Sequence, residues 1–158
     1  MSKSFAFRAS AVIGAAVLLL AGCAPAPEKP GENGGGEQFC ARMVTNSGGL
    51  DDRSFNDASW KGLQQAEKDF GIDADVLVSN SETDLAPNVQ QAVDTGCGFV
   101  LTVGYELADA TADQAAKNPD VDFAIVDEVV DAPNVKPIVF DTAQAAYLAG
   151  YLAAGVTK

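Results

Sequence analysis

Short apolar stretches alternate with helix-like stretches throughout residues 39–158, and this alternation restricts the fold more than any other feature of the sequence. The apolar stretches are nearly continuous, which is typical of strands buried on both faces of a sheet. Strands that alternate with helices in this way usually form a parallel sheet covered by helices. The sequence therefore predicts an α/β domain with a parallel, doubly wound sheet.

Glycine, proline and capping residues set the expected boundaries of these elements. The expected strands are residues 39–45, 76–78, 99–103, 123–126 and 135–140, and the expected helices include 54–70 and 106–117. The expected helix caps are Ser54, Thr83 or Asp84, and Thr142. Pro137 predicts that the last strand lies at an edge of the sheet. In the first helix, the spacing of Trp60, Leu63 and Phe70 predicts a core stripe.

The first 38 residues have the features of an export signal followed by a linker. Lys3 and Arg8 precede an uncharged apolar run that is too short to span a bilayer. The run ends in Leu20-Ala21-Gly22-Cys23, which resembles the lipobox of bacterial lipoproteins. We interpret residues 1–22 as a lipoprotein signal peptide and Cys23 as the lipidated residue; an ordinary signal peptide with an incidental cysteine is the alternative.

Residues 24–38 are rich in proline, glycine and glutamate and show no apolar periodicity. Such a composition predicts a disordered tether between the lipidated cysteine and the folded part. The expected location is therefore the extracytoplasmic face of the cell membrane, where a lipid anchor holds the protein.

The charge and composition of the chain exclude several classes of function. Its formal net charge is −12, and removal of Lys3 and Arg8 with the signal makes it −14. This charge argues against nucleic acid as a partner. The chain contains no histidine, which excludes Ser-His-Asp and Cys-His catalysis and histidine-based metal sites within it. No P-loop, nucleophile elbow or metal-ligand cluster is visible, so we expect neither an enzyme nor a cofactor or metal site.

Two cysteines remain after Cys23, and outside the cytoplasm an even number favours a disulfide. Cys40 starts the first expected strand and Cys97 precedes the third. In the doubly wound order 2-1-3 these strands are neighbours about 4.8 Å apart, which is within reach of a disulfide. We therefore predict a Cys40–Cys97 bond; two small buried residues are the alternative.

Several motifs resemble, in order, those of the basic membrane protein family, whose members are lipoprotein substrate-binding components of ABC transporters. They are Val44-Thr45-Asn46-Ser47-Gly48-Gly49-Leu50-Asp51-Asp52-Arg53-Ser54-Phe55-Asn56, Pro87-Asn88-Val89-Gln90-Gln91, Val103-Gly104, Phe123-Ala124-Ile125-Val126-Asp127 and Ala146-Tyr147-Leu148-Ala149-Gly150. The resemblance implies a type I periplasmic-binding-protein fold, with a ligand between two α/β lobes. Residues 39–158 correspond to the N-terminal lobe, closed by the last helix, and the second lobe is missing, so the sequence looks truncated.

The resemblance also implies roles for single residues, since characterised family members bind purine nucleosides. Phe55 would stack on the base, although a core phenylalanine of the first helix is the alternative. Asn46, where the family often has aspartate, would contact the base, and Asp127 would hold the ribose hydroxyls. Gly104 would let the backbone approach the ligand. For Asp51 and Asp52 we favour loop and cap roles over ligand binding.

We therefore expect a solute-binding lipoprotein of an ABC transporter, with a purine nucleoside as ligand and a membrane permease as partner. A lipoprotein that senses another small molecule, or a non-functional fragment, remains the alternative. A neighbouring gene for an ATPase or a permease would favour transport over sensing.

Overall fold

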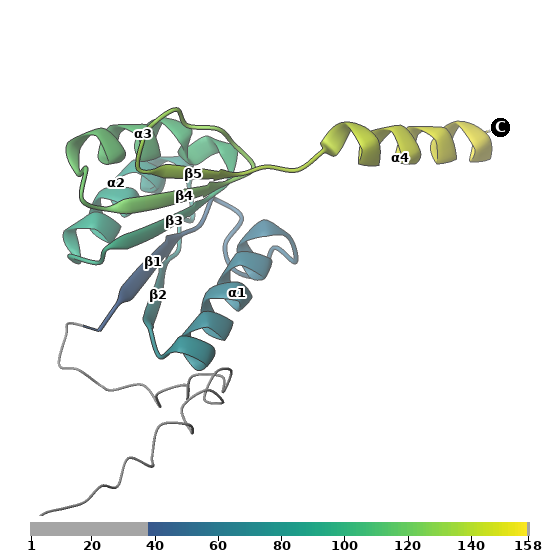
Figure 1. Ribbon diagram of the computed structural model, residues 1–158. Coiled ribbons are helices and arrows are strands. Elements are labelled where there is room, and N and C mark those ends of the chain that lie inside the picture. Colours follow the sequence, from purple (N-terminus) through teal and green to yellow (C-terminus); the bar gives the residue numbers. More distant parts are fainter. Residues whose placement is uncertain (1–37, 158) are drawn as a thin grey trace, which may run out of the picture. The chain divides into compact units, whose positions relative to one another are not determined.

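The computed structural model describes residues 38–157, so the predicted signal peptide, Cys23 and almost all of the predicted tether lie outside the described residues. Residues 38–157 belong to one unit, drawn in colour in Figure 1. Its strands are β1 (Cys40–Val44), β2 (Asp73–Leu77), β3 (Phe99–Val103), β4 (Asp122–Val126) and β5 (Val135–Ile138). Its helices are α1 (Phe55–Phe70), α2 (Glu82–Asp94), the 3-10 turn η1 (Tyr105–Leu107), α3 (Ala108–Lys117) and α4 (Thr142–Val156).

All five strands are parallel and lie in the order β2-β1-β3-β4-β5, so the predicted parallel, doubly wound α/β sheet is confirmed. The predicted 2-1-3 order is confirmed too, and β5, which contains Pro137, lies at an edge. In this order β3 is the middle strand and β1 lies beside it, so the carboxyl ends of β1 and β3 are side by side. Ligands bind beyond this end in open parallel sheets.

The two faces of the sheet are covered to different extents (Figure 1). Helices α2 and α3 pack on one face, where fully buried side chains such as Val89, Val100 and Phe123 form the larger core. Helix α1 packs on the other face, and only Leu63 of its predicted stripe is buried. Trp60 is half-buried and Phe70 is 80% exposed, so the prediction for Phe70 is wrong. Helical spacing shows which side chains share a face, but not how far along the helix the sheet reaches.

Three helix starts differ from the predicted caps. Ser54 precedes α1, but its side chain makes no capping bond, and Asp52 caps this helix instead. Helix α2 begins at Glu82, so Ser81 is its N-cap. Asp84 lies in the first turn of α2, and its carboxylate accepts the Ser81 backbone N–H. Asp141, not Thr142, caps α4 by accepting the Gln144 N–H. At α1 and α4 a carboxylate accepts backbone N–H groups at the start of the helix, whereas Ser81 and Asp84 form a capping box at α2.

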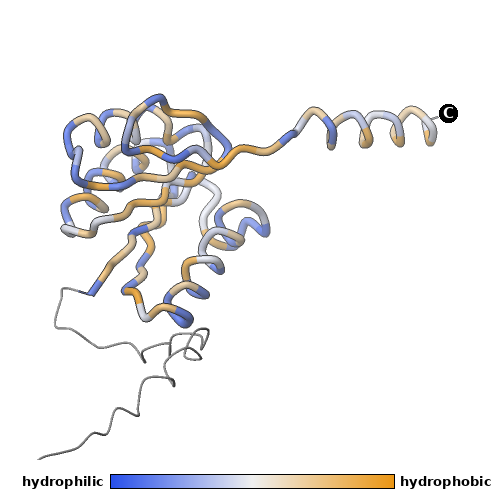
Figure 2. Tube along the Cα trace, viewed as in Figure 1, coloured by the Kyte–Doolittle hydropathy of each residue, from blue (hydrophilic) through white to orange (hydrophobic). Residues whose placement is uncertain are grey.

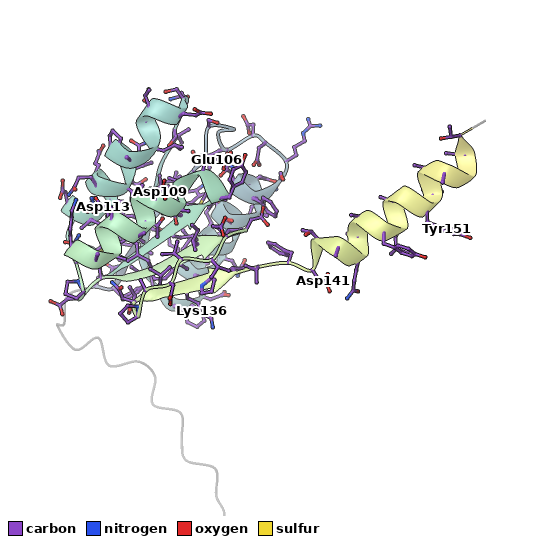
Figure 3. The ribbon with its side chains drawn as sticks, turned by 90° about the horizontal axis from the view of Figure 1, so that it is seen from above. Glu106, Asp109, Asp113, Lys136, Asp141 and Tyr151 are labelled. Atoms are coloured by element: carbon purple, nitrogen blue, oxygen red, sulfur yellow. A yellow bond between two sulfur atoms is a disulfide. The ribbon has the colours of Figure 1, made fainter. Side chains whose placement is uncertain are left out.

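Helix α4 forms where the sequence predicts it, but it does not cover the sheet. Every residue of α4 is exposed, and Figure 3 shows Asp141 and Tyr151 marking a helix that extends beyond the sheet. Figure 2 shows that much of α4 is apolar. Within residues 38–157, no helix combines the length and apolarity needed to cross a membrane. Because every residue of α4 is exposed, the prediction that this helix closes the lobe is not met.

An apolar groove with a volume of about 400 Å³ lies on the α1 side of the sheet. It is lined by Phe55, Ala58, Ser59, Gly62, Leu63, Phe99, Leu101, Ala124, Val126, Ile138 and Phe140. The lining residues come from α1, from the strands β3, β4 and β5, and from the segment after β5.

The predicted disulfide between Cys40 and Cys97 is confirmed, with the two Cα atoms 5.1 Å apart. The register pairs Ala41 with Phe99, which brings Cys97, two residues before β3, close to the start of β1. Cys97 is buried. The bond therefore joins the amino ends of the neighbouring strands β1 and β3, opposite the edge where ligands bind in such sheets.

Candidate functional site

Three of the predicted site residues lie at the same level on neighbouring strands. Val44 pairs with Thr102, so Asn46, two residues beyond, aligns with Gly104. Val103 pairs with Val126, so Gly104 in turn aligns with Asp127. Adjacent strands are about 4.8 Å apart, which makes this row about 10 Å long. The structure therefore brings Asn46, Gly104 and Asp127 together at the carboxyl ends of β1, β3 and β4, and we call them the strand-end row.

Asn46 is held in one orientation by its neighbours. Its side-chain oxygen Oδ1 accepts hydrogen bonds from the Gly48 backbone N–H at 2.9 Å and from Asn56 Nδ2 at 2.7 Å. Asn56 Oδ1 accepts the Asn46 backbone N–H at 3.3 Å. Asn56 is fully buried, whereas Asn46 is half-buried at the end of β1. Asn56 was missed as a positioning residue, although it closes the motif that begins at Val44.

Asp52 fixes the start of α1, the helix that carries Phe55 and Asn56. Its carboxylate accepts the backbone N–H groups of Ser54, Asn56 and Asp57 at distances of 2.8 to 3.0 Å. Burial favours the neutral form, but hydrogen bonds from Ser54, Asp57 and Asn56 outweigh it and hold the pKa of Asp52 below its usual value. The cap role predicted for Asp52 is confirmed.

Gly104 allows the chain to pass close to two polar side chains. Its φ of 108° lies in a region that L side chains rarely adopt. A Cβ atom at this position would lie 2.7 Å from Glu106 Oε2 and 2.9 Å from Asn46 Nδ2. A larger residue would therefore fill the space that these two polar groups share.

Asp127 has a φ of 66°, which is unusual for a residue other than glycine and is tolerated best by aspartate and asparagine. Its backbone N–H donates to the Ile138 carbonyl at 2.8 Å, and the Gly104 N–H donates to the Val126 carbonyl at 3.0 Å. The backbone thus fixes the place of Asp127 in the row. Strained backbone of this kind is a common feature of binding sites.

Phe55 is the first residue of α1. Its ring stacks on Phe140, with centroids 5.4 Å apart and an interplanar angle of 20°. Both rings line the apolar groove. Phe140 covers one face of the half-buried Phe55 ring. The sequence pattern did not indicate Phe140 as the partner of Phe55.

Buried hydrogen bonds behind the row tie the ends of β1 and β2 to α2. Thr45 Oγ1 accepts the Ser79 backbone N–H at 2.9 Å, and Asn88 Nδ2 donates to Ser79 Oγ at 2.9 Å. Thr45 and Ser79 are fully buried. Asn88 belongs to the motif Pro87-Asn88-Val89-Gln90-Gln91, so the sequence could have indicated it as a hydrogen-bonding residue. Within residues 38–157, no group of three or more histidine, cysteine, aspartate or glutamate side chains could hold a metal ion.

Comparison with known sequences adds a family to this geometry. The sequence profile of the family described as ABC transporter substrate-binding protein PnrA-like matches residues 40–158. The chain is 36% identical over 163 residues to the CD4+ T-cell-stimulating antigen of Listeria innocua, covering 99% of the chain and 46% of that protein. It is 37% identical over 155 residues to the ABC transporter nucleoside-binding protein BmpA of Lactococcus lactis, covering 94% of the chain and 44% of BmpA. The chain thus spans about half the length of these curated relatives.

Solved structures with the same fold include two solute-binding proteins of ABC transporter systems. The protein from Aeropyrum pernix K1 has a TM-score of 0.65 and 23% identity, covering 71% of this chain and 31% of that one. The protein from Conexibacter woesei has a TM-score of 0.58 and 24% identity, covering 72% of this chain and 39% of that one. At these identities the likeness shows a shared fold, that of a single lobe.

Proposed function

This chain belongs to the family of PnrA-like ABC transporter substrate-binding proteins, and we propose that it forms one lobe of a receptor that holds a purine nucleoside and delivers it to a membrane permease. The family consists of substrate-binding proteins and not of enzymes. One relative that covers most of the chain is described as nucleoside-binding, which supports this class of ligand.

The strand-end row is the observation that carries the proposal. It combines a carboxamide at Asn46, open backbone at Gly104 and a carboxylate at Asp127 along about 10 Å of the ligand-binding edge. A carboxylate can accept protons from both hydroxyls of a ribose diol. The carboxamide of Asn46, at the end of β1 and two strands away from β4, can then reach the base. The row thus offers separate polar groups for the two ends of a nucleoside.

Phe140 covers one face of the Phe55 ring, and the base would stack on the other face. Stacking of a base on an aromatic ring contributes roughly 1–3 kcal/mol. The observed pair with Phe140 would hold the Phe55 ring in place, because its second face is already occupied.

The role of Asp127 can be measured by NMR titration of residues 37–158 with inosine, guanosine and adenosine. We expect weak binding, with a dissociation constant on the order of 1 mM, and shifts centred on the strand-end row. Asp127→Ala should weaken binding about tenfold, because it removes both ribose hydrogen bonds. Asp51→Ala, which changes the charge equally at an exposed loop residue, should bind like the parent. Shifts confined to α4 or absent altogether would contradict the receptor proposal.

The lipid anchor is a separate part of the proposal and rests on Cys23 in the Leu20-Ala21-Gly22-Cys23 motif. Changing Cys23 to serine removes the thiol that accepts the lipid while leaving the export signal intact. We expect the variant to leave the membrane fraction or to accumulate as uncleaved precursor. Normal processing and membrane association of the variant would assign the anchor to another feature.

A further inference from the structure

Helix α4 carries a bulky apolar face that is exposed to water. The face consists of residues that lie next to one another or one helical turn apart, namely Tyr147, Leu148, Tyr151 and Leu152. Their exposed fractions are 66 to 75%. The helix contains no charged residue between Thr142 and Val156, so it can be buried without the cost of removing a charge from water.

The apolar groove on the α1 side of the sheet is complementary to this face. None of the residues that line the groove is charged. On α1 the lining includes three small residues, Ala58, Ser59 and Gly62, which leave room for bulky side chains beside the sheet. Small residues on one surface and bulky residues on the other allow the interdigitated packing that protein interiors require.

The chain between β5 and α4 favours a second copy over the helix of the same chain as the occupant of the groove. Phe140 stacks on Phe55 inside the groove, and the Thr142 backbone N–H donates to the Phe140 carbonyl at 2.9 Å. Asp141 then caps α4, which extends beyond the sheet (Figure 3). The helix can turn back into its own groove only if residues 139–141 reverse direction, which disrupts these contacts. The helix of a second copy can enter the groove while all of them remain.

We propose that two copies of this chain form a symmetric dimer in which α4 of each copy packs into the apolar groove of the other. The inference rests on the groove and the helix and does not depend on the proposed nucleoside site. Each copy has one groove and one helix, so a two-fold axis pairs both of them and leaves neither exposed. Such an exchange of identical elements is a low-cost route to a dimer.

The area of this contact is sufficient for a stable dimer. An aromatic side chain buries 150–250 Å², so Tyr147 and Tyr151 of the two copies together bury roughly 600–1,000 Å². Leu148, Leu152 and the surface of the two grooves bring the total to the roughly 1,200–2,000 Å² that specific interfaces bury. Tyrosine is also enriched at interfaces, whereas charged residues are depleted from their centres, as they are here.

The test is the mass in solution of the chain after Cys23, with the Cys40–Cys97 bond formed, measured by size-exclusion chromatography with light scattering. We expect a dimer at high micromolar concentration that dissociates on dilution. Tyr151→Glu places a charge in the bulky face and should raise the dissociation constant of the dimer at least about tenfold. Ala58→Glu, at an exposed position of the groove, should do the same from the other side of the contact. Ala146→Glu adds the same charge to the opposite face of α4 and should keep the dimer.

A mixture of Ala58→Glu with Tyr151→Glu identifies the exchange itself. In a mixed dimer, the unchanged helix of the first variant meets the unchanged groove of the second, so the mixture should dimerise more tightly than either variant alone. Both positions are exposed, and circular dichroism checks that each variant keeps the fold. A parent that stays monomeric at every concentration would overturn the inference, because α4 would then remain free or pack against its own chain. A dimer that Ala58→Glu leaves intact would also overturn it, because α4 would then contact a surface other than the groove.

Discussion

Replacing both Cys40 and Cys97 with alanine should lower the free energy of unfolding of residues 37–158 by about 4 kcal/mol. The bond joins residues 57 positions apart, and a loop of this length restricts the unfolded chain strongly. The bond also connects the amino ends of β1 and β3, two neighbouring strands inside the sheet. Urea denaturation of the oxidised parent and of the double variant measures the difference.

The reduced parent is the matched control for this experiment. It lacks the cross-link but keeps both sulfur atoms, so its stability should lie within about 1 kcal/mol of the double alanine variant. A reduced parent as stable as the oxidised one would show that packing around the buried Cys97, and not the covalent bond, accounts for the loss.

The sheet could be predicted because its strands carry a local signal. The bounds predicted for β3, Phe99–Val103, are the observed ones, because a short apolar run between Gly98 and Gly104 is typical of a buried strand. The order 2-1-3 followed from general rules for parallel sheets, and this order made the disulfide predictable. These features depend on a few residues and on topology, not on detailed side-chain packing.

The site could be predicted only in part, because its geometry depends on residues far apart in the sequence. Asn46, Gly104 and Asp127 were predicted from motif positions, and their alignment follows from strand register. The clamp by Asn56 and the stacking of Phe140 on Phe55 depend on how the start of α1 meets β1 and on the path of the chain after β5. Neither the packing of the start of α1 against β1 nor the course of the chain after β5 gives a periodic pattern in the sequence.

The apolar groove and the exposed helix α4 are related features of this lobe. The groove is lined mainly by apolar side chains of α1, β3 and β4, and α4 exposes Tyr147, Leu148, Tyr151 and Leu152. Exposed apolar surface of this kind is costly in water and usually contacts another part of the protein or a partner. The chain spans about half the length of its curated relatives.

A protein that continues this chain through a second lobe should bind a purine nucleoside at least about a hundredfold more tightly than residues 37–158 alone, a difference of about 2.7 kcal/mol. In the single lobe, a base stacked on Phe55 keeps its other face in water, and the groups of the strand-end row contact the ligand from one side only. A second lobe can add a stacking partner worth roughly 1–3 kcal/mol, together with further hydrogen bonds. Closure of two lobes also excludes water, which strengthens the polar contacts already present.

Calorimetric titration of the longer protein, together with NMR titration of residues 37–158, measures this gain with the same nucleosides. In the longer protein, Phe55→Ala and Asp127→Ala should each remove most of the binding, because each deletes the contact to one end of the ligand. Asp51→Ala, at an exposed residue of the loop before α1, should leave the affinity unchanged. Dissociation constants in the micromolar range for the single lobe would contradict the argument, because one side of a site would then supply nearly all of the binding free energy. Absence of nucleoside binding by the longer protein would favour the sensing lipoprotein, with a different small molecule as its ligand.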